Sequence, residues 1–482
     1  MTVTALSALF MALACLFSLF GGFAFAGAYT TAVLPLILVT LFYCRGLATI
    51  DRLCTYILVV FLWSFYLARP LFLLTDLEYY KFGIIMGDFI DVHVHTLFWL
   101  AGLNTISVVI AMVVLGSFLR IPSGSLLPGP RLARLPTILF FAAIAIMGLY
   151  FLLSLLEAMG SDLGRKAVRL MELAAFVQIT IPVMVGFLIV RNTAPGNQQR
   201  TWLALTAVLL YSGALFLQGS KLFVIELVVL FFLFMLVFYG DRKLSLPWIG
   251  AYAGLTVLVV ISFPLAMAVR RLTGEMGLSG LSPSLIVDRI DMMSSYMSGN
   301  SIWEFPLDLL TRRLNGYDGL IVAFDKVSYA DLSDFNVMTM LSNALAGLLP
   351  GVAADSISFG QLTSRLFYGF AVEDDVAHAG GVGHFGMLRL FAGSPVLTFV
   401  LGVTLFAFIW SATLVAACRM LHNPLLRFAL FGSLIMTSAL CLSGGNFDRV
   451  LQETIIAFVH AAILSVFITY RQPVLRRREP VR

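Results

Sequence analysis

Long apolar stretches recur along the chain and are separated by shorter polar connections. A helix needs about 20 apolar residues to cross the hydrocarbon core of a membrane. Stretches of this length without alternation of polar and apolar positions favour helices over a β-barrel. The pattern therefore predicts an all-α polytopic membrane protein with about twelve transmembrane helices. They lie near residues 4–20, 27–43, 53–74, 95–119, 136–156, 173–190, 202–218, 222–239, 247–268, 395–418, 425–443 and 453–470.

The longest polar stretch, residues 270–394, separates the ninth predicted span from the tenth. The chain is accordingly divided into residues 1–269 with transmembrane helices 1–9, a large, partly helical extracytoplasmic loop in 270–394, transmembrane helices 10–12 in 395–470, and a basic cytoplasmic tail in 471–482. A capping pattern at 301–304 and an apolar run at 337–349 indicate that the loop is folded. We expect its helices to lie on, or dip into, the outer membrane surface.

Charge is distributed unequally between alternate connections. Lys and Arg retained on the cytoplasmic side set the orientation of transmembrane helices. One set of connections carries sixteen basic residues against three acidic ones, whereas the long loop carries eight against thirteen. Both termini are therefore expected in the cytoplasm and the long loop outside, and this asymmetry explains the net charge of +5. The sixteen are Arg45, Arg52, Arg120, Arg131, Arg134, Arg191, Arg200, Arg242, Lys243, Arg419, Arg427, Arg471, Arg476, Arg477, Arg478 and Arg482.

Composition supports a membrane protein and excludes several function classes. Of the 482 residues, 60% are hydrophobic and 12% charged, whereas soluble proteins have about 25% charged residues. The cysteines lie in or beside apolar runs and form neither a disulfide framework nor a Cys-x-x-Cys metal site. The signatures of P-loop ATPases, zinc proteases and serine hydrolases are absent. We expect no metal, no cofactor and no nucleic-acid partner.

Two adjacent arginines in the loop, Arg312 and Arg313, precede the segment Asn315-Gly316-Tyr317-Asp318. A guanidinium group offers a planar set of donors to a phosphate or carboxylate and stays charged at any working pH. The alternative is that both arginines complement a helix dipole and pair with Asp308 or Asp318. The sequence leaves both interpretations open.

Lys221, in Gln218-Gly219-Ser220-Lys221, and Arg69, directly before Pro70, each stand at the outer end of an apolar span. A charge costs about 2.5–3.5 kcal/mol at the membrane centre, but near a helix end its side chain extends to water at little cost. Each residue therefore has two interpretations, a solvated side chain or a member of a functional site.

Histidines and acidic residues supply candidates for acid–base chemistry. His378 and His384 flank a glycine-rich run, and either is a candidate general base or donor. The acidic run 373–375 either binds a cation or sugar hydroxyls, or is merely solvated. His93 and His95 are two residues apart, which places them on different faces of a helix. We interpret both as interfacial residues.

Three local patterns resemble one known family. They are Leu217-Gln218-Gly219-Ser220-Lys221-Leu222 at the entry to an apolar span, Arg313-Leu314-Asn315-Gly316-Tyr317-Asp318 in the outer loop, and the glycine-rich run 383–393 before the next span. Together with many spans and one large late loop, they resemble the oligosaccharide repeat-unit polymerases of bacterial surface polysaccharides, the Wzy-type or O-antigen polymerase-like proteins. Two departures are clear: Lys221 stands where Arg is commoner, and Met387 stands where a Glu is expected.

This resemblance implies a membrane glycosyltransferase of the GT-C type in the bacterial inner membrane. Such an enzyme moves a growing glycan from undecaprenyl diphosphate to a hydroxyl of the next lipid-linked repeat unit on the outer face, and needs no ATP. Fixed positive donors ease departure of the diphosphate, and a base takes the proton of the acceptor hydroxyl. The candidates are His384, His378 and Asp318 for the base and Arg313, Arg312, Lys221, Arg270 and Arg365 for the diphosphate.

The expected partners are the lipid bilayer and the undecaprenyl diphosphate-linked oligosaccharide, with a chain-length regulator and a flippase as further possibilities. Two alternatives remain open. An O-antigen ligase-type transferase differs mainly in its acceptor. A secondary transporter would show internal repeats and ionisable residues near the membrane midplane. The sequence shows no clear halves, and its polar residues crowd one side.

Overall fold

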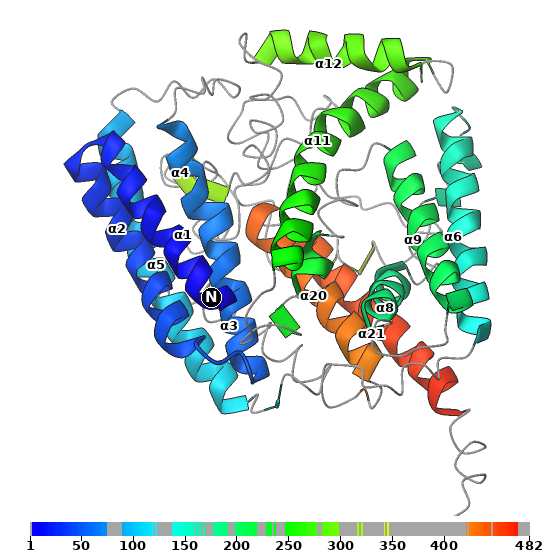
Figure 1. Ribbon diagram of the computed structural model, residues 1–482, viewed down its shortest axis with the longest axis horizontal. Helices are drawn as coiled ribbons and strands as arrows, with labels where there is room; N and C mark the ends of the chain where they lie inside the picture. The colour runs from blue at the N-terminus through cyan, green and yellow to red at the C-terminus, as the bar shows by residue number, and fades with distance from the viewer. Residues whose placement is uncertain are drawn as a thin grey trace, which may run out of the picture.

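The computed structural model of the chain is a bundle of helices (Figure 1). Apart from an isolated bridge between Thr49 and Pro122, the regular structure in the described part is helical. The fold class predicted from the sequence is therefore confirmed as a helical bundle. The structure describes residues 2–74, 89–118, 121–122, 137–159, 161, 163–164, 167–168, 177–190, 198–218, 228–233, 236–237, 246–276, 282–297, 316–317, 320–321, 342, 345–346, 421, 424–444 and 447–470.

Most helices begin and end close to the limits of the apolar stretches. In chain order they are α1 (Val3–Phe17), α2 (Phe23–Leu38), α3 (Ile50–Leu62), α4 (Ala68–Leu73), α5 (Phe89–Phe118), α6 (Thr137–Ala158), α8 (Val177–Val190), α9 (Gln198–Leu217), α11 (Leu246–Met276), α12 (Pro283–Met297), α20 (Pro424–Gly444) and α21 (Phe447–Tyr470). A 3-10 turn, η1 (Ser18–Gly21), extends α1. Two π-helical turns continue α2 and α3, namely η2 (Val39–Tyr43) and η3 (Trp63–Leu67).

Six helical segments in the described residues are long and apolar enough to cross a membrane. They are Val3–Gly21, Phe23–Tyr43, Ile50–Phe72, His93–Ser117, Thr137–Ala158 and Gln198–Leu217. Each matches a span predicted from the sequence, and these six predictions are confirmed as apolar helices. Shorter apolar helices at Ile179–Leu188, Leu426–Thr437 and Leu451–Val466 coincide with three further predicted spans. The predicted span 395–418 lies outside the described residues, so the total of twelve stays a prediction.

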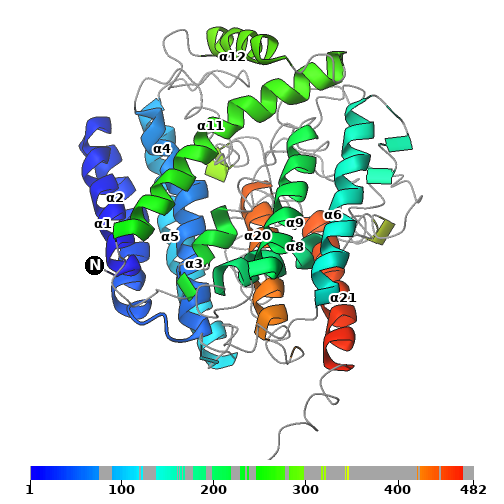
Figure 2. The same cartoon turned by 45° about the vertical axis from the view of Figure 1, so that its right-hand side comes forward.

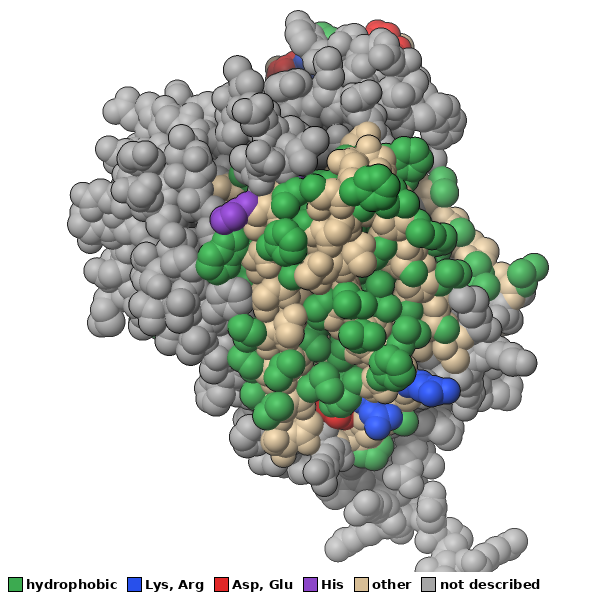
Figure 3. Space-filling view, turned by 90° about the vertical axis from the view of Figure 1, so that its left-hand side faces the viewer, with side chains coloured by type: hydrophobic (Ala, Val, Ile, Leu, Met, Phe, Trp, Pro, Cys, Tyr) green, Lys and Arg blue, Asp and Glu red, His purple; other side chains and the backbone are tan. Residues whose placement is uncertain are grey.

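The outer surface of the first helices is apolar, as contact with lipid requires. Figure 3 shows this face, on which hydrophobic side chains cover the middle while Lys and Arg side chains gather at the lower edge. Exposed side chains on α1, η2 and α5 include Phe10, Phe42 and Val113, which are 57%, 74% and 61% exposed. The segment Ile50–Phe72, which contains α3, differs because most of it is buried inside the protein. It is the inner helix of this group.

Pairs of helices pack closely along the bundle. In the N-terminal group α2 packs on α5, and α3 packs on α5 as well. In the second group α6 and α9 run parallel, because Arg200 bonds to Thr137 near their first turns and Gln218 bonds to Ser154 near their last. α20 packs against both α8 and α21. One continuous hydrophobic core joins these groups.

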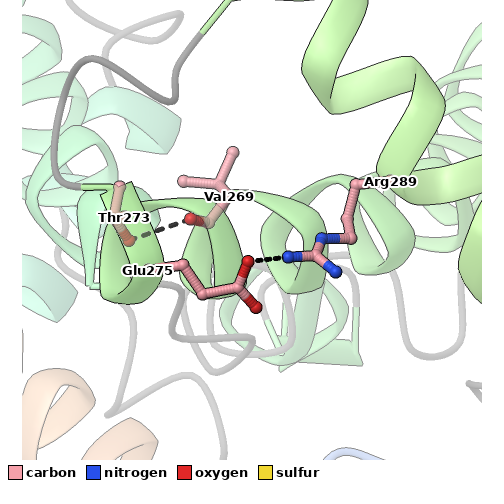
Figure 4. A network of polar contacts seen from close by, with 4 residues as sticks. All are labelled: Val269, Thr273, Glu275 and Arg289. Atoms are coloured by element: carbon pink, nitrogen blue, oxygen red, sulfur yellow. Dashed lines mark hydrogen bonds and ion pairs between the residues drawn. The ribbon is translucent and has the colours of Figure 1, made fainter.

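Two helices extend the bundle at one end. α11 continues past residue 268, where the predicted span ends, to Met276, and α12 lies across the end of the bundle in both views (Figures 1 and 2). Arg289 of α12 makes an ion pair with Glu275 at the end of α11 (Figure 4). Whether this crosswise helix lies on a membrane surface stays a prediction. The helices expected at 301–314 and 337–349 fall almost entirely outside the described residues.

We predict that Gly213→Leu destabilises the bundle. A Cβ at Gly213 of α9 would lie 3.0 Å from the ring of Phe151 on α6. The larger side chain must push the two helices apart, at a cost of about 1–3 kcal/mol. The fraction of protein that remains monodisperse in detergent after heating should therefore fall.

Gly27 of α2 provides the matched control. A Cβ there meets nothing within 4 Å, so Gly27→Leu should cost no more than about 0.5 kcal/mol. Equal losses from the two variants would contradict close packing of α6 on α9.

Candidate functional site

The structure places few of the site residues that the sequence predicts. Arg270 lies on α11, and its side chain is outside the described part. The remaining candidates lie outside the described residues: Lys221, Arg312, Arg313, Asp318, Arg365, His378 and His384. Whether they converge on one site therefore stays a prediction. The structure does describe residues that adjoin two of the motifs, and these define the candidate site.

Four residues in and after the Arg313–Asp318 motif are described, and below they are called the docked turn: Gly316, Tyr317, Leu320 and Ile321. Gly316 and Tyr317 are helical and buried, and so are Leu320 and Ile321. Tyr317, Leu320 and Ile321 have positions i, i+3 and i+4, which share one face of a helix, and all three belong to the hydrophobic core. In Figures 1 and 2 this piece of the chain lies beside α4. These residues are thus anchored in the helical bundle.

Tyr317 packs against His93, which lies in the first turns of α5. The hydroxyl of Tyr317 and Nδ1 of His93 share a hydrogen bond of 2.7 Å, and both side chains are 0% exposed. Their rings are stacked, with centroids 5.6 Å apart and planes 11° apart, while Phe25 of α2 lies edge-on to the imidazole at 6.4 Å. His93 is therefore enclosed by the protein, and its place at the membrane interface stays a prediction. His95, which is exposed, faces away as expected.

Gly316 sits against the π-helical turn η3. A Cβ at Gly316 would lie 3.1 Å from the carbonyl oxygen of Phe65 and 3.1 Å from the ring of Tyr66. Tyr66 is 0% exposed, so its ring has no free space into which to move. The glycine is explained by this close approach of two backbones.

The shape of η3 follows from Pro70. A proline has no N–H, and its ring crowds the carbonyl four residues before it, which is that of Tyr66. The helix widens over Trp63–Leu67, where the N–H of Ala68 donates to the carbonyl of Trp63. The hydroxyl of Tyr29 on α2 donates to the carbonyl of Leu67 at 2.8 Å. Such π-turns within helices occur frequently at functional sites.

Arg69 lies on the helical turn after Phe65 and Tyr66, the residues that contact Gly316. Spacings of three and four residues put it on the same side of the helix as those two. Its side chain is 1% exposed. An enclosed guanidinium does not extend to water, so the solvated interpretation of Arg69 is wrong. Its position before a proline at a span end singled out Arg69 in the sequence, but did not indicate burial.

The second motif is anchored through Gln218. Its amide nitrogen donates to the hydroxyls of Ser154 at 3.0 Å and Tyr150 at 3.2 Å, both on α6. Tyr150 also stacks on Tyr211 of α9, with ring centroids 6.2 Å apart. This buried network fixes where the chain leaves α9 toward Lys221.

The other end of the α3 segment carries a separate polar group. The hydroxyl of Tyr43 donates to Asp51 at 2.7 Å, and the guanidinium of Arg52 lies 5.9 Å from the centre of the Tyr43 ring. Burial raises the pKa of the nearby Cys44 thiol to about 12, so this thiol stays protonated at neutral pH. At about 1.5 Å per residue, Arg52 and Arg69 are about 26 Å apart along the helix, close to the thickness of the hydrocarbon core.

The arrangement is an anchoring surface made by α5 and η3 for a loop rich in cationic and acid–base candidates. Within the described residues no group of three or more His, Cys, Asp or Glu side chains is placed to hold a metal ion. No protein-family model, curated protein or solved structure matches this chain. Function must therefore be argued from the site itself.

We predict that Gly316→Ala loosens the docked turn. The added methyl group meets the Phe65 carbonyl and the fully buried Tyr66 ring at 3.1 Å, and overpacking of this kind costs about 1–3 kcal/mol. Amide hydrogen exchange over residues 316–321 should become at least about fivefold faster, because exchange reports local opening.

Gly250→Ala on α11 is the control for this comparison, because a Cβ at that position meets nothing within 4 Å. Its effect on exchange at residues 316–321 should be negligible. Unchanged exchange in Gly316→Ala would mean that the turn is not packed against η3.

Proposed function

We propose that the protein polymerises lipid-linked oligosaccharide repeat units on the outer face of the bacterial inner membrane, in surface polysaccharide biosynthesis. It transfers a growing glycan from undecaprenyl diphosphate to a hydroxyl group of the next repeat unit. The observation that carries the proposal is the docking of Gly316–Tyr317 on His93 and η3. It attaches the loop motif that contains Arg313 and Asp318 to one end of an apolar helical bundle.

That location suits a lipid-linked substrate. The polyprenyl chain requires an apolar surface, which the helices supply, while its diphosphate and sugars require a polar site at the end of the bundle. Docking brings the two together. Chain geometry allows at most about 3.6 Å per residue, so Arg313 and Asp318 stay close to the anchored Tyr317 in any conformation of the loop.

The chemistry follows from the residue types. The bond between the donor sugar and the diphosphate breaks, and a new bond forms between that sugar carbon and the acceptor oxygen. Arg313, aided by Arg312, Lys221, Arg270 and Arg365, stabilises the charge that develops on the departing diphosphate. His384 or His378, or Asp318 in their place, takes the proton of the acceptor hydroxyl. The diphosphate carries its own activation, and no ATP is required.

The polymerase and its alternatives are separated by reconstitution. Purified protein in lipid is supplied with the undecaprenyl diphosphate-linked repeat unit of the same cell, and the glycans are separated on a gel. A ladder of lengthening glycans supports the polymerase. Transfer to a different lipid acceptor without a ladder would establish the ligase reaction, and absence of any transfer would favour transport.

We predict that Arg313→Ala abolishes polymer while membrane insertion stays intact. Loss of one donor to a developing charge lowers turnover by about 10²–10³. Arg313→Lys should retain part of the activity, because it keeps the charge but loses the bidentate geometry. The yield of glycan ladder per amount of folded protein measures the effect.

Asp331→Ala, in the same loop, is the control and should change the ladder little. Full-length polymer from Arg313→Ala would remove this arginine from the mechanism.

A further inference from the structure

The contact between Tyr317 and His93 joins parts of the chain that are 224 residues apart. Both side chains are fully buried. Neither therefore touches a substrate in this structure, and any effect of the pair on the reaction must act through other residues. The role of the pair follows from its contact, which is a directional hydrogen bond between two stacked rings.

Apolar burial and the polar pair have different consequences for the docked turn. Leu320 and Ile321 are 0% and 5% exposed, and their burial holds the turn against the bundle. Burial of apolar surface is non-directional, so it permits the turn to rotate or slide. A hydrogen bond of 2.7 Å between stacked rings has a narrow geometry. It selects a single register of the turn on α5.

Register matters because charged candidates directly flank the turn. Asp318 follows Tyr317 at once, so their Cα atoms are about 3.8 Å apart. Arg313 precedes Tyr317 by four residues, which limits its Cα to within about 14 Å of that of Tyr317. Rotation of the turn by one residue would swing both flanking segments away from any fixed substrate.

We infer that Tyr317 is a positioning residue which, with His93 as its receptor, fixes Arg313 and Asp318 over the end of the bundle where the lipid diphosphate is handled. The positioning role rests on the proposed function. The contact itself does not, so the two are tested by separate measurements on the same variants of the full-length protein in lipid nanodiscs.

The variants remove the hydrogen bond and keep the rings. Tyr317→Phe loses the hydroxyl, His93→Phe loses Nδ1, and the double variant loses both. The matched control is Tyr56→Phe, because Tyr56 is also fully buried, stacks on Phe232 and shares its hydroxyl with Ser7, but it joins α3 to α1.

The first measurement is amide hydrogen exchange over residues 316–321. Loss of a net contribution typical of one neutral hydrogen bond should speed exchange about fivefold in Tyr317→Phe and in His93→Phe. The double variant should exchange no faster than the single ones, because it leaves neither of the two buried polar groups without its partner. Tyr56→Phe should leave exchange at this turn unchanged.

The second measurement is glycan transfer per folded molecule, with kcat and KM determined separately. Misplacement of Arg313 acts on the departing diphosphate, so kcat should fall about tenfold or more in Tyr317→Phe while KM changes less than about twofold. A purely structural role would lower the amount of folded protein and leave the kcat of the survivors unchanged.

Each result decides the inference. Faster exchange with lower kcat supports positioning by Tyr317. Faster exchange with unchanged kcat overturns it, and so does unchanged exchange, which would mean that Leu320 and Ile321 alone hold the turn. Absence of transfer by the wild-type protein refutes the proposed reaction and the positioning role with it, whereas the exchange arm still decides whether the pair holds the turn.

Discussion

Polar groups inside an apolar bundle must find partners within the protein, because the hydrocarbon core of a membrane offers none. In the described residues this constraint is met mainly near helix ends. Examples of such buried or half-buried contacts are Tyr317 with His93, Gln218 with Tyr150 and Ser154, and Tyr43 with Asp51. Between the ends, Asn104 donates to the carbonyl of Ala32 and ties α5 to α2.

A single proline explains much of the local geometry at one end. Pro70 cannot donate to the carbonyl of Tyr66, and the helix widens over the turn η3. The wider turn leaves a surface that a backbone without a Cβ can approach, and Gly316 occupies it. Pro70 therefore explains the turn η3, and η3 in turn explains why Gly316 packs there. Arg69, enclosed beside this turn, shares the same surroundings.

Hydropathy predicted what depends on local composition. The six segments that are long and apolar enough to cross a membrane coincide with predicted spans, because each needs only a long run of apolar residues. α12 was not predicted, since its apolar residues are interrupted by the charged residues Asp288, Arg289 and Asp291 and the helix is too short for a span. Its start was nonetheless readable: Ser282 accepts a hydrogen bond from the N–H of Leu285, and Pro283 takes the first helical position.

The burial of His93 and Arg69 could not be predicted from the sequence, because it depends on contacts with distant parts of the chain. Both stand at span ends, where a solvated side chain is the ordinary outcome. His93 is buried because Tyr317 covers it, and that contact spans 224 residues. Periodicity describes neighbours along one helix, and it carries no information about which distant turn docks there. The candidate residues of the loop were therefore identified by type and motif, without their receptor.

The contributions to the docked turn differ in size and role: apolar burial attaches the turn to the bundle, and the hydrogen bond sets its register. Burial of a large aliphatic side chain contributes about 1.5–3 kcal/mol, so Leu320 and Ile321 together outweigh a neutral hydrogen bond, which contributes about 0.5–1.5 kcal/mol net. The apolar pair therefore holds the turn in the bundle even when the Tyr317–His93 bond is broken. Because the smaller term is directional, it sets the register without being needed for folding. A loop held in this way stays attached to the bundle while the position of its charged residues is adjusted by one buried pair.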